Sequence, residues 1–492
     1  MYDLTFDPEK YEVKTCEFGE RKVTYRAFEH IVYCANPVSK VQTLNIYVPE
    51  CYYEGGEING YSLHTAPIFA PNTVGGYMEG PAMEVGIDKF NHKPNSAFEA
   101  LLHGYVVMCA GIRGRNTGMK SKEFFVGGAG DETASQEEKL TGRAPAIIVD
   151  MKAAIRYMRH NARKVPGDVE KIVTNGTSAG GALSALAGAT GNAKDYEPYL
   201  NEIGAADERD DIFAANCYCP IHNLEHADAA YEWLFAKEPV YHMMKFKMSP
   251  EGPKMVPDVG ELSPEQKELS AELKAEFPAY VNSLDLRDQD GKALTLDADG
   301  EGSFKDYVMS FVLASATKEK ATHDSQNRLS DLAVAGSAIE EQDYISYEGA
   351  QASQLDVDAY VARITRMKPV PAFDALTLNS PENEEFGDDK VMARHFTDFS
   401  LRHSKAGGKK ADASVIRLLN PTAFIGECDT TKHWRIRHGA FDRDTSIAIP
   451  VILATLLKNK GYDVDFALPW GLPHSGDYDL KEAFAWIDQI AK

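Results

Sequence analysis

The sequence predicts an α/β protein with a mostly parallel central sheet and one large insertion. Short β-rich runs bounded by Gly, Pro or Asn alternate with amphipathic helical runs in the first half of the chain. The same alternation returns near the C-terminus, whereas the long segment between the two halves lacks it. An alternation of strands and helices favours a parallel sheet that is covered by helices on both faces.

Four strands and one helix are predicted in the first half of the chain. The helix lies between the last two strands, where apolar residues from Ile148 to Met158 recur at steps of three, four and three and so share one helical face. Each strand candidate is a short run flanked by residues that interrupt strands. The four candidates are Thr43 to Val48, Pro67 to Pro71, Tyr105 to Cys109 and Lys171 to Thr174.

The C-terminal part repeats this pattern. Strands are predicted at Trp434 to Arg437 and at Val464 to Leu468, with a helix from Ile447 to Leu457 between them. A last helix follows, because the apolar residues from Leu480 to Ile487 are spaced by four and three. Asp477 stands where a side chain is expected to cap the N-terminus of that helix.

The segment between roughly residues 220 and 406 is predicted to be an insertion that folds over the sheet as a lid. It is rich in Glu, Lys, Asp and Pro, yet it keeps too many aromatic side chains for a disordered linker, among them Trp233, Phe311 and Phe373. We therefore expect residues 1–219 and 407–492 to form the two parts of one core, and residues 220–406 to form the lid.

Composition and charge exclude several classes of function. The 52 basic against 74 acidic side chains give a formal charge of −22, which disfavours nucleic acid and anionic membranes as partners. No apolar run approaches the roughly 18 to 20 residues of a membrane-spanning helix. The acidic N-terminus does not resemble a secretory signal, and the seven scattered cysteines suggest reduced thiols. These features predict a cytoplasmic protein with a small-molecule partner.

A candidate nucleophile follows the fourth predicted strand. Gly176-Thr177-Ser178-Ala179-Gly180 matches G-x-S-x-G and precedes an Ala-rich helical run from Ala182 to Ala189. A nucleophilic serine needs a sharp turn that lifts its oxygen above the sheet, and the two glycines let the strand and the helix approach. The alternative is a glycine-rich helix start that binds phosphate. We rank it lower, since neither G-x-G-x-x-G nor a Walker lysine accompanies the motif.

The order along the chain also supplies an acid and a base. A serine hydroxyl needs a general base, and that base needs a carboxylate that orients it. Asp442 follows the strand at Trp434 to Arg437, and His474 follows the last strand, so the order is serine, acid, histidine. The sequence thus predicts a triad of Ser178, Asp442 and His474.

Backbone N–H groups are expected to stabilise the oxyanion that such a nucleophile creates. Ala179, directly after the serine, supplies one of them. The loop after the strand at Pro67 to Pro71 supplies the second through Gly75 or Gly76, although a glycine pair of this kind also occurs in plain turns.

Two metal-like motifs favour structural roles. His222-Asn223-Leu224-Glu225-His226 fits an H-x-x-E-H zinc pattern, but it follows a strand exit and lacks a third carboxylate ligand. Asp297-Ala298-Asp299-Gly300-Glu301 resembles the start of a calcium loop without its full ligand series. We therefore predict no metal and no organic cofactor.

Along most of its length the chain resembles the bacterial tannases, which are serine esterases of the α/β-hydrolase fold that cleave galloyl esters and depsides to gallic acid. The residues that carry the resemblance form long runs, and they are more specific than G-x-S-x-G alone. These runs are Gly142 to Ala146, Val173 to Gly181, Lys368 to Asp374 and Trp434 to Ser446.

The resemblance implies an α/β-hydrolase fold with an inserted lid and the same triad that the spacing predicts. It also implies that Lys368 and Glu382 from the lid, together with Asp444, bind the phenolic hydroxyls of a galloyl ring. Two carboxylates and an ammonium match three adjacent hydroxyls, and an ester without these hydroxyls would leave the charges unpaired.

Three functional hypotheses remain at this level. The first is a tannase that works through an acyl-enzyme. The second uses the same triad on other substrates, as a feruloyl esterase, a general carboxylesterase or a peptidase, because a fold does not determine a substrate. The third is a non-catalytic protein that binds phenolic ligands. The sequence leaves the oligomeric state and the preferred ester size open.

Overall fold

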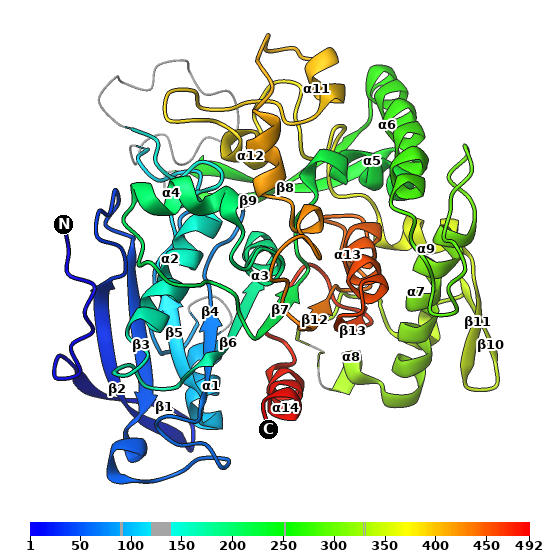
Figure 1. Cartoon of the computed structure of the whole chain (residues 1–492). Helices are drawn as coiled ribbons and strands as arrows, with labels where there is room; N and C mark the ends of the chain where they lie inside the picture. The colour runs from blue at the N-terminus through cyan, green and yellow to red at the C-terminus, as the bar shows by residue number, and fades with distance from the viewer. Residues whose placement is uncertain (89–91, 120–138, 250–251, 328, 330) are drawn as a thin grey trace.

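A nine-stranded sheet forms the centre of the molecule (Figure 1). The computed structural model describes residues 1–88, 92–119, 139–249, 252–327, 329 and 331–492. The order of the strands in the sheet is β1-β2-β3-β5-β4-β6-β7-β12-β13. Pairing is antiparallel from β1 to β5 and parallel from β5 to β13. The strands are β1 (Glu12–Phe18), β2 (Arg21–Val32), β3 (Thr43–Pro49), β4 (Pro67–Pro71), β5 (Val106–Ala110), β6 (Asp168–Thr177), β7 (Ala214–Tyr218), β12 (His433–Arg437) and β13 (Asp463–Ala467).

Helices flank the sheet, and most of them lie in the segments of the chain that connect one parallel strand to the next. Helix α3 packs against β6, β7 and α2, while α1 packs against β4, β5 and α14. Apolar side chains hold these layers together, as where Phe69 of β4 meets Phe484 of α14 edge to face at 5.4 Å between ring centroids. The flanking helices are α1 (Ser96–His103), α2 (Ala146–His160), α3 (Ala179–Ala189), α4 (Glu197–Glu202), α13 (Ala448–Asn459) and α14 (Leu480–Ala491).

The elements between β7 and β12 lie outside the nine-stranded sheet. In Figure 1 they lie along the top of the molecule, where α11 and α12 are labelled, and along its right side, where α6, α7 and α9 are labelled. Two antiparallel hairpins belong to this segment, β8 (Val240–Ser249) with β9 (Gly252–Glu261) and β10 (Ile345–Glu348) with β11 (Gln351–Leu355). Its helices are α5 (Leu224–Phe235), α6 (Pro264–Ser283), α7 (Ser303–Thr322), α8 (Asp324–Asn327), α9 (Val357–Ile364), α10 (Pro381–Glu385), α11 (Asp398–Arg402) and α12 (Ala413–Leu418).

One apolar cluster joins this segment to the sheet. It includes buried side chains of the sheet, such as Ile436 on β12, and buried side chains between β7 and β12, such as Phe277 on α6 and Phe304 on α7.

Short 3₁₀ helices complete the chain at Glu50–Glu54, Lys194–Tyr196, Ile339–Glu341 and Pro421–Ala423. In the described part of the chain no helix is long and apolar enough to cross a membrane.

All six predicted strands occur, each within a few residues of its expected bounds, and so do the predicted helices. The predicted cap of the last helix is wrong. Asp479 stands at the N-cap of α14, and Asp477 instead accepts a hydrogen bond from Asn175 Nδ2 at 3.0 Å. The Asp477 carboxylate is therefore bound to the end of β6 and does not cap the helix, because the amide of Asn175 satisfies it inside the protein.

Candidate active site

Ser178 lies on a strained turn between β6 and α3. Its backbone has φ +63° and ψ −125°, a conformation that costs free energy for a residue with a side chain. Hydrogen bonds hold the turn from both sides, since Ser178 N–H donates to Tyr218 O at 3.0 Å and Ile221 N–H donates to Ser178 O at 3.2 Å. The surrounding backbone thus maintains the sharp turn that the G-x-S-x-G motif predicted.

The two glycines of the motif are required by close packing. A Cβ atom on Gly176 would lie 2.2 Å from the carbonyl oxygen of Gly180, and one on Gly180 would lie 2.5 Å from Asn72 Oδ1. Both distances are too short for a carbon atom. The motif therefore permits the contact between the strand, the helix and the neighbouring loop, as the sequence indicated.

Asp442 and His474 form a tight pair beside this turn. His474 Nδ1 lies 2.7 Å from Asp442 Oδ2, and Asp442 Oδ1 accepts a hydrogen bond from the Asp444 N–H at 2.8 Å. Asp442 is completely buried, which by itself raises its pKa, but His474 and His438 outweigh this effect and lower the pKa overall. Burial alone lowers the pKa of His474, but Asp442 more than offsets this and raises it well above 6.5.

The serine and the histidine meet around Cys219. Besides the helical bond from the Ala182 N–H, the Ser178 backbone forms hydrogen bonds with Tyr218 and Ile221, on either side of Cys219. The Sγ atom of Cys219 in turn lies 3.9 Å from His474 Nε2. Among the hydrogen bonds of the described residues, none joins Ser178 Oγ to His474 Nε2. Catalytic hydrogen bonds of this kind commonly form only when substrate is bound.

The loop that carries Gly75 and Gly76 packs against the Ser178 turn. Asn72 Nδ2 donates to the carbonyl oxygens of Asn175 and Gly180, each at 3.0 Å. Within the described part of the chain, the N–H groups of Gly75, Gly76 and Ala179 make no hydrogen bond to protein. These donors are therefore free to bind an oxyanion.

Arg115 is a site residue that the sequence did not predict. Its Nε donates to Gly76 O at 2.8 Å, and its backbone N–H donates to Tyr77 O at 2.7 Å. Its Nη1 donates to Glu384 on α10, so one guanidinium connects the glycine loop to the segment between β7 and β12. An arginine in a short polar stretch, two residues after Arg113, carries no local signal of such a role.

The three charged residues expected to bind phenolic hydroxyls also gather here. Lys368 Nζ lies 2.9 Å from Asp444 Oδ1 and 3.9 Å from the centre of the Phe373 ring. Although burial raises the pKa of Asp444, Lys368 lowers it to about 2 overall. Glu382 on α10 is buried, which raises its pKa, while Lys368 nearby lowers it to a smaller extent. The structure thus brings one ammonium and two carboxylates together next to Asp442.

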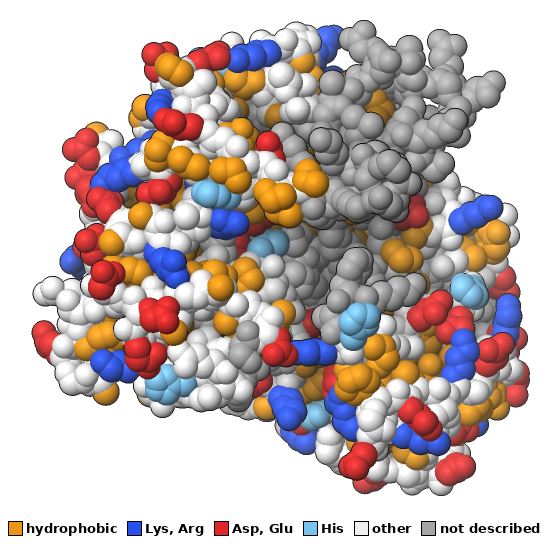
Figure 2. All heavy atoms as spheres, turned by 180° about the vertical axis from the view of Figure 1, so that it is seen from behind, with side chains coloured by type: hydrophobic (Ala, Val, Ile, Leu, Met, Phe, Trp, Pro, Cys, Tyr) orange, Lys and Arg blue, Asp and Glu red, His pale blue; other side chains and the backbone are white. Residues whose placement is uncertain are grey.

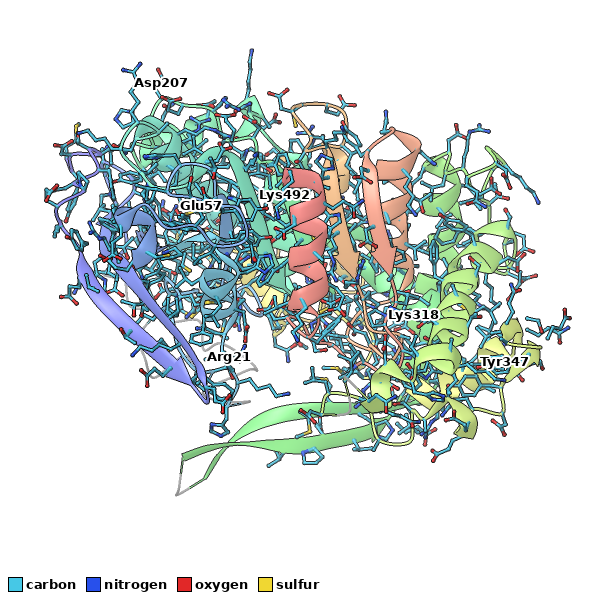
Figure 3. All side chains as sticks on the ribbon, turned by 90° about the horizontal axis from the view of Figure 1, so that it is seen from below. Arg21, Glu57, Asp207, Lys318, Tyr347 and Lys492 are labelled. Carbon is cyan, nitrogen blue, oxygen red and sulfur yellow. The ribbon has the colours of Figure 1, made fainter. Side chains whose placement is uncertain are left out.

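A cavity of about 1440 Å³ adjoins the segment that follows His474. Its walls include Arg21 on β2 and Lys318 on α7, which lie on opposite sides in Figure 3. Gly476 and Tyr478 contribute to the wall on the side of the triad. On the face shown in Figure 2, acidic, basic and apolar side chains are interspersed.

The two metal-like motifs have structural surroundings. His226 stacks on Tyr280 with ring centroids 3.5 Å apart, and His222 is completely buried. In the other motif, Asp297 Oδ1 accepts hydrogen bonds from the N–H groups of Asp299 and Glu301, which makes it a turn residue.

Comparisons with known proteins decide the family. A tannase from Lactobacillus plantarum has a solved structure that is 44% identical to this chain, covers 100% of both chains and superposes with a TM-score of 0.89. The tannase from Fusobacterium nucleatum is 43% identical over 100% of both chains, also with a TM-score of 0.89. The chain belongs to the tannase family. Its fold is accordingly the α/β-hydrolase fold, and its family consists of carboxylic ester hydrolases.

Other similarities agree with this assignment. The BD-FAE family model matches residues 133–232, which include the Ser178 turn. Esterase LipC of Mycobacterium tuberculosis is 48% identical over 60 residues, which are 12% of this chain and 15% of that protein. A tannin acyl hydrolase whose structure was solved in complex with ethyl gallate is 44% identical over 99% of both chains, with a TM-score of 0.87.

Proposed function

We propose that this chain hydrolyses galloyl esters and depsides to gallic acid through an acyl-enzyme on Ser178. The observation that carries the proposal is the pairing of two contacts, Asp442 with His474 and Lys368 with Asp444. The first supplies a general base beside the serine turn, and the second supplies charges suited to phenolic hydroxyls. Asp442 and Asp444 are also joined by a hydrogen bond, which keeps the two functions in one geometry.

In the first step, Ser178 attacks the galloyl carbonyl carbon while His474 Nε2 accepts the hydroxyl proton. Asp442 holds Nδ1 of the ring and stabilises the imidazolium that forms. The carbonyl oxygen becomes an oxyanion, which the N–H group of Ala179 and one of the Gly75 and Gly76 N–H groups bind. His474 then returns the proton to the departing alcohol or phenol.

In the second step, water attacks the galloyl-enzyme. His474 removes a proton from the water, the same N–H groups bind the second oxyanion, and the Ser178 oxygen leaves with that proton. Gallate is released and the serine is restored. In this cycle the groups of the chain act by proton transfer and by electrostatic stabilisation of the oxyanion.

Recognition of the ring rests on Lys368, Glu382 and Asp444. The ammonium donates hydrogen bonds and the carboxylates accept them, so three adjacent hydroxyls find partners of both kinds. Lys368 and Asp444 already pair with each other. An unsubstituted benzoyl ring would nevertheless bury the three charged groups without meeting their remaining hydrogen-bonding capacity, at a cost of about 1 to 3 kcal/mol for each unmet group. The complex of a related tannin acyl hydrolase with ethyl gallate supports this choice of ring.

We also propose that residues 220–406 act as a lid over the site. Two of the three ring-binding residues, Lys368 and Glu382, belong to this segment, and the link from Arg115 to Glu384 fastens it to the glycine loop.

All seven cysteines are unpaired, which supports a reducing compartment such as the cytoplasm.

The decisive test is turnover of methyl gallate beside methyl benzoate and methyl ferulate. We expect release of gallic acid from methyl gallate at least 100-fold faster, by kcat/KM, than release of benzoate. Ser178→Ala should abolish turnover and labelling by a fluorophosphonate. The control Ser353→Ala, at a partly exposed serine on β11, should leave both unchanged. Equal turnover of all three esters would keep the esterase and reject the galloyl specificity, and full activity in Ser178→Ala would reject the mechanism.

A further inference from the structure

A thiol lies beside the imidazole that the proposed mechanism uses. Cys219 directly follows β7, and its Sγ is 3.9 Å from His474 Nε2 and 3.3 Å from the Ser475 carbonyl oxygen, to which it donates. Cys219 is completely buried, while about a quarter of the His474 side chain is open to solvent. The imidazole thus separates the thiol from the outside, and any group that binds His474 Nε2 arrives next to the sulfur.

These two atoms have the spacing of a pair of metal ligands. Typical bond lengths are about 2.3 Å from zinc to thiolate sulfur and about 2.0 Å from zinc to imidazole nitrogen. For an ion at those distances from two atoms 3.9 Å apart, the angle between the two bonds is roughly 130°, so a shift of a few tenths of an ångström between the two side chains would bring it to the tetrahedral value. Cys219, Asp442 and His474 also form a group whose possible ligand atoms all lie within 4.8 Å of one another.

Asp442 prepares the histidine for this role. Zinc-binding histidines commonly donate their second ring N–H to a carboxylate, which orients the ring and strengthens the nitrogen as a ligand. The contact of 2.7 Å between His474 Nδ1 and Asp442 Oδ2 is an arrangement of this kind, and it leaves the lone pair of Nε2 directed toward Cys219. The contact that makes Nε2 a base therefore also makes it a good ligand.

We propose that Cys219 and His474 form a binding site for a soft divalent cation such as Zn²⁺ or Cd²⁺, and that its occupation inhibits the enzyme. On binding, the Cys219 thiol and the protonated Nε2 of His474 each release a proton to solvent, and the thiolate and the neutral nitrogen each donate an electron pair to the ion. No group is oxidised or reduced. The remaining positions of the ion accept water or an oxygen of the Ser178 side chain. A bound ion inhibits because it occupies Nε2, so that His474 can no longer accept the serine proton. This inhibition rests on the proposed function, but the binding of the metal is independent of it.

The test is a titration of the whole chain with ZnCl₂ by calorimetry and with CdCl₂ by ultraviolet absorption of the cadmium–thiolate bond. Three variants are compared with the wild type. Cys219→Ala removes the sulfur, and Cys219→Ser keeps a donor to Ser475 O but replaces sulfur by a poor zinc ligand. Cys428→Ala is the matched control, because Cys428 Sγ also donates to a carbonyl, that of Ala189 at 3.2 Å, and is more exposed.

We expect one site in the wild type and in Cys428→Ala, and at least tenfold weaker binding with loss of the cadmium–thiolate band in both Cys219 variants. The metal concentration that halves the turnover of methyl gallate should rise at least tenfold in Cys219→Ser, relative to its own metal-free rate. Equal affinity in wild type and both Cys219 variants, or no binding to the wild type at millimolar Zn²⁺, would overturn the proposal. If methyl gallate is not a substrate, the titrations still decide whether the site exists.

Discussion

Replacing Lys368 by Met tests ring recognition most directly. The substitution keeps the length of the side chain and removes the ammonium that lies 2.9 Å from Asp444 Oδ1. A hydrogen bond from a charged group contributes about 1.5 to 3 kcal/mol. Since 1.4 kcal/mol corresponds to a tenfold change, kcat/KM for methyl gallate should fall by roughly 10- to 150-fold. Methyl benzoate lacks the hydroxyls, so its kcat/KM should change by less than about threefold.

The same substitution should destabilise the fold by a magnitude that follows from Asp444. Burial raises the pKa of this carboxyl, but Lys368 lowers it from an ordinary 3.8 to about 2. With about 1.4 kcal/mol per pKa unit, that change stabilises the native state by about 2.5 kcal/mol at neutral pH. Because the pKa is lowered on folding, this contribution is present above about pH 4 and disappears as the pH falls through 2. We expect most of it to be lost in Lys368→Met.

The measurement combines urea unfolding at pH 7 with kcat/KM for both esters. Lys237→Met is the matched control, since Lys237 pairs with Asp358 at 2.6 Å but both side chains are mostly exposed. It should leave the ratio of kcat/KM for the two esters unchanged. It should change the free energy of unfolding by no more than about 0.5 kcal/mol. The double variant Lys368→Met with Asp444→Asn should recover stability without recovering selectivity. An unchanged ratio of gallate to benzoate turnover in Lys368→Met would refute the reasoning.

Three further predictions concern the triad and the glycine loop. The proposed mechanism requires neutral His474, whose pKa stands well above 6.5, so kcat/KM should fall as the pH drops through that raised value. Asp442→Asn should lower kcat roughly 10³- to 10⁴-fold. In a pH–rate profile, it should also move the acid-side fall in kcat/KM to lower pH, because Asp442 raises the pKa of His474. Arg115→Ala, which frees the Gly76 carbonyl, should lower kcat about 10-fold for both methyl gallate and methyl benzoate, and a loss confined to KM would contradict a positioning role. Gly180→Ala forces a Cβ to within 2.5 Å of a side-chain oxygen of the neighbouring loop and should cost about 1 to 3 kcal/mol in urea unfolding; wild-type stability would show that the turn can relax.

Several of the predicted strands were recognisable because a strand that is buried on both faces forms a short, continuous apolar run. Ile68 and Phe69 on β4 belong to a short apolar run between strand-breaking residues, and every side chain of β4 is buried. Strands β1 and β2 gave no such signal, since β1 lies at the edge of the sheet and is mostly exposed. Strand β7, Ala214–Tyr218, has weak strand formers, and its pairing with β6 and β12 holds it in the sheet.

The sequence by itself determined the features that depend on local backbone geometry. Gly176, Ser178 and Gly180 specify a turn whose shape follows from neighbouring residues, and the order of serine, acid and histidine follows from the order of the strands. Tertiary structure decided the contacts between distant parts of the chain, because side-chain distances depend on how the elements pack. Cys219 and His474 are 255 positions apart and meet at 3.9 Å. Their contact exists because the parallel strands β7 and β13 both end at the same edge of the sheet, and Cys219 and His474 follow those ends. No local pattern of residues encodes this proximity.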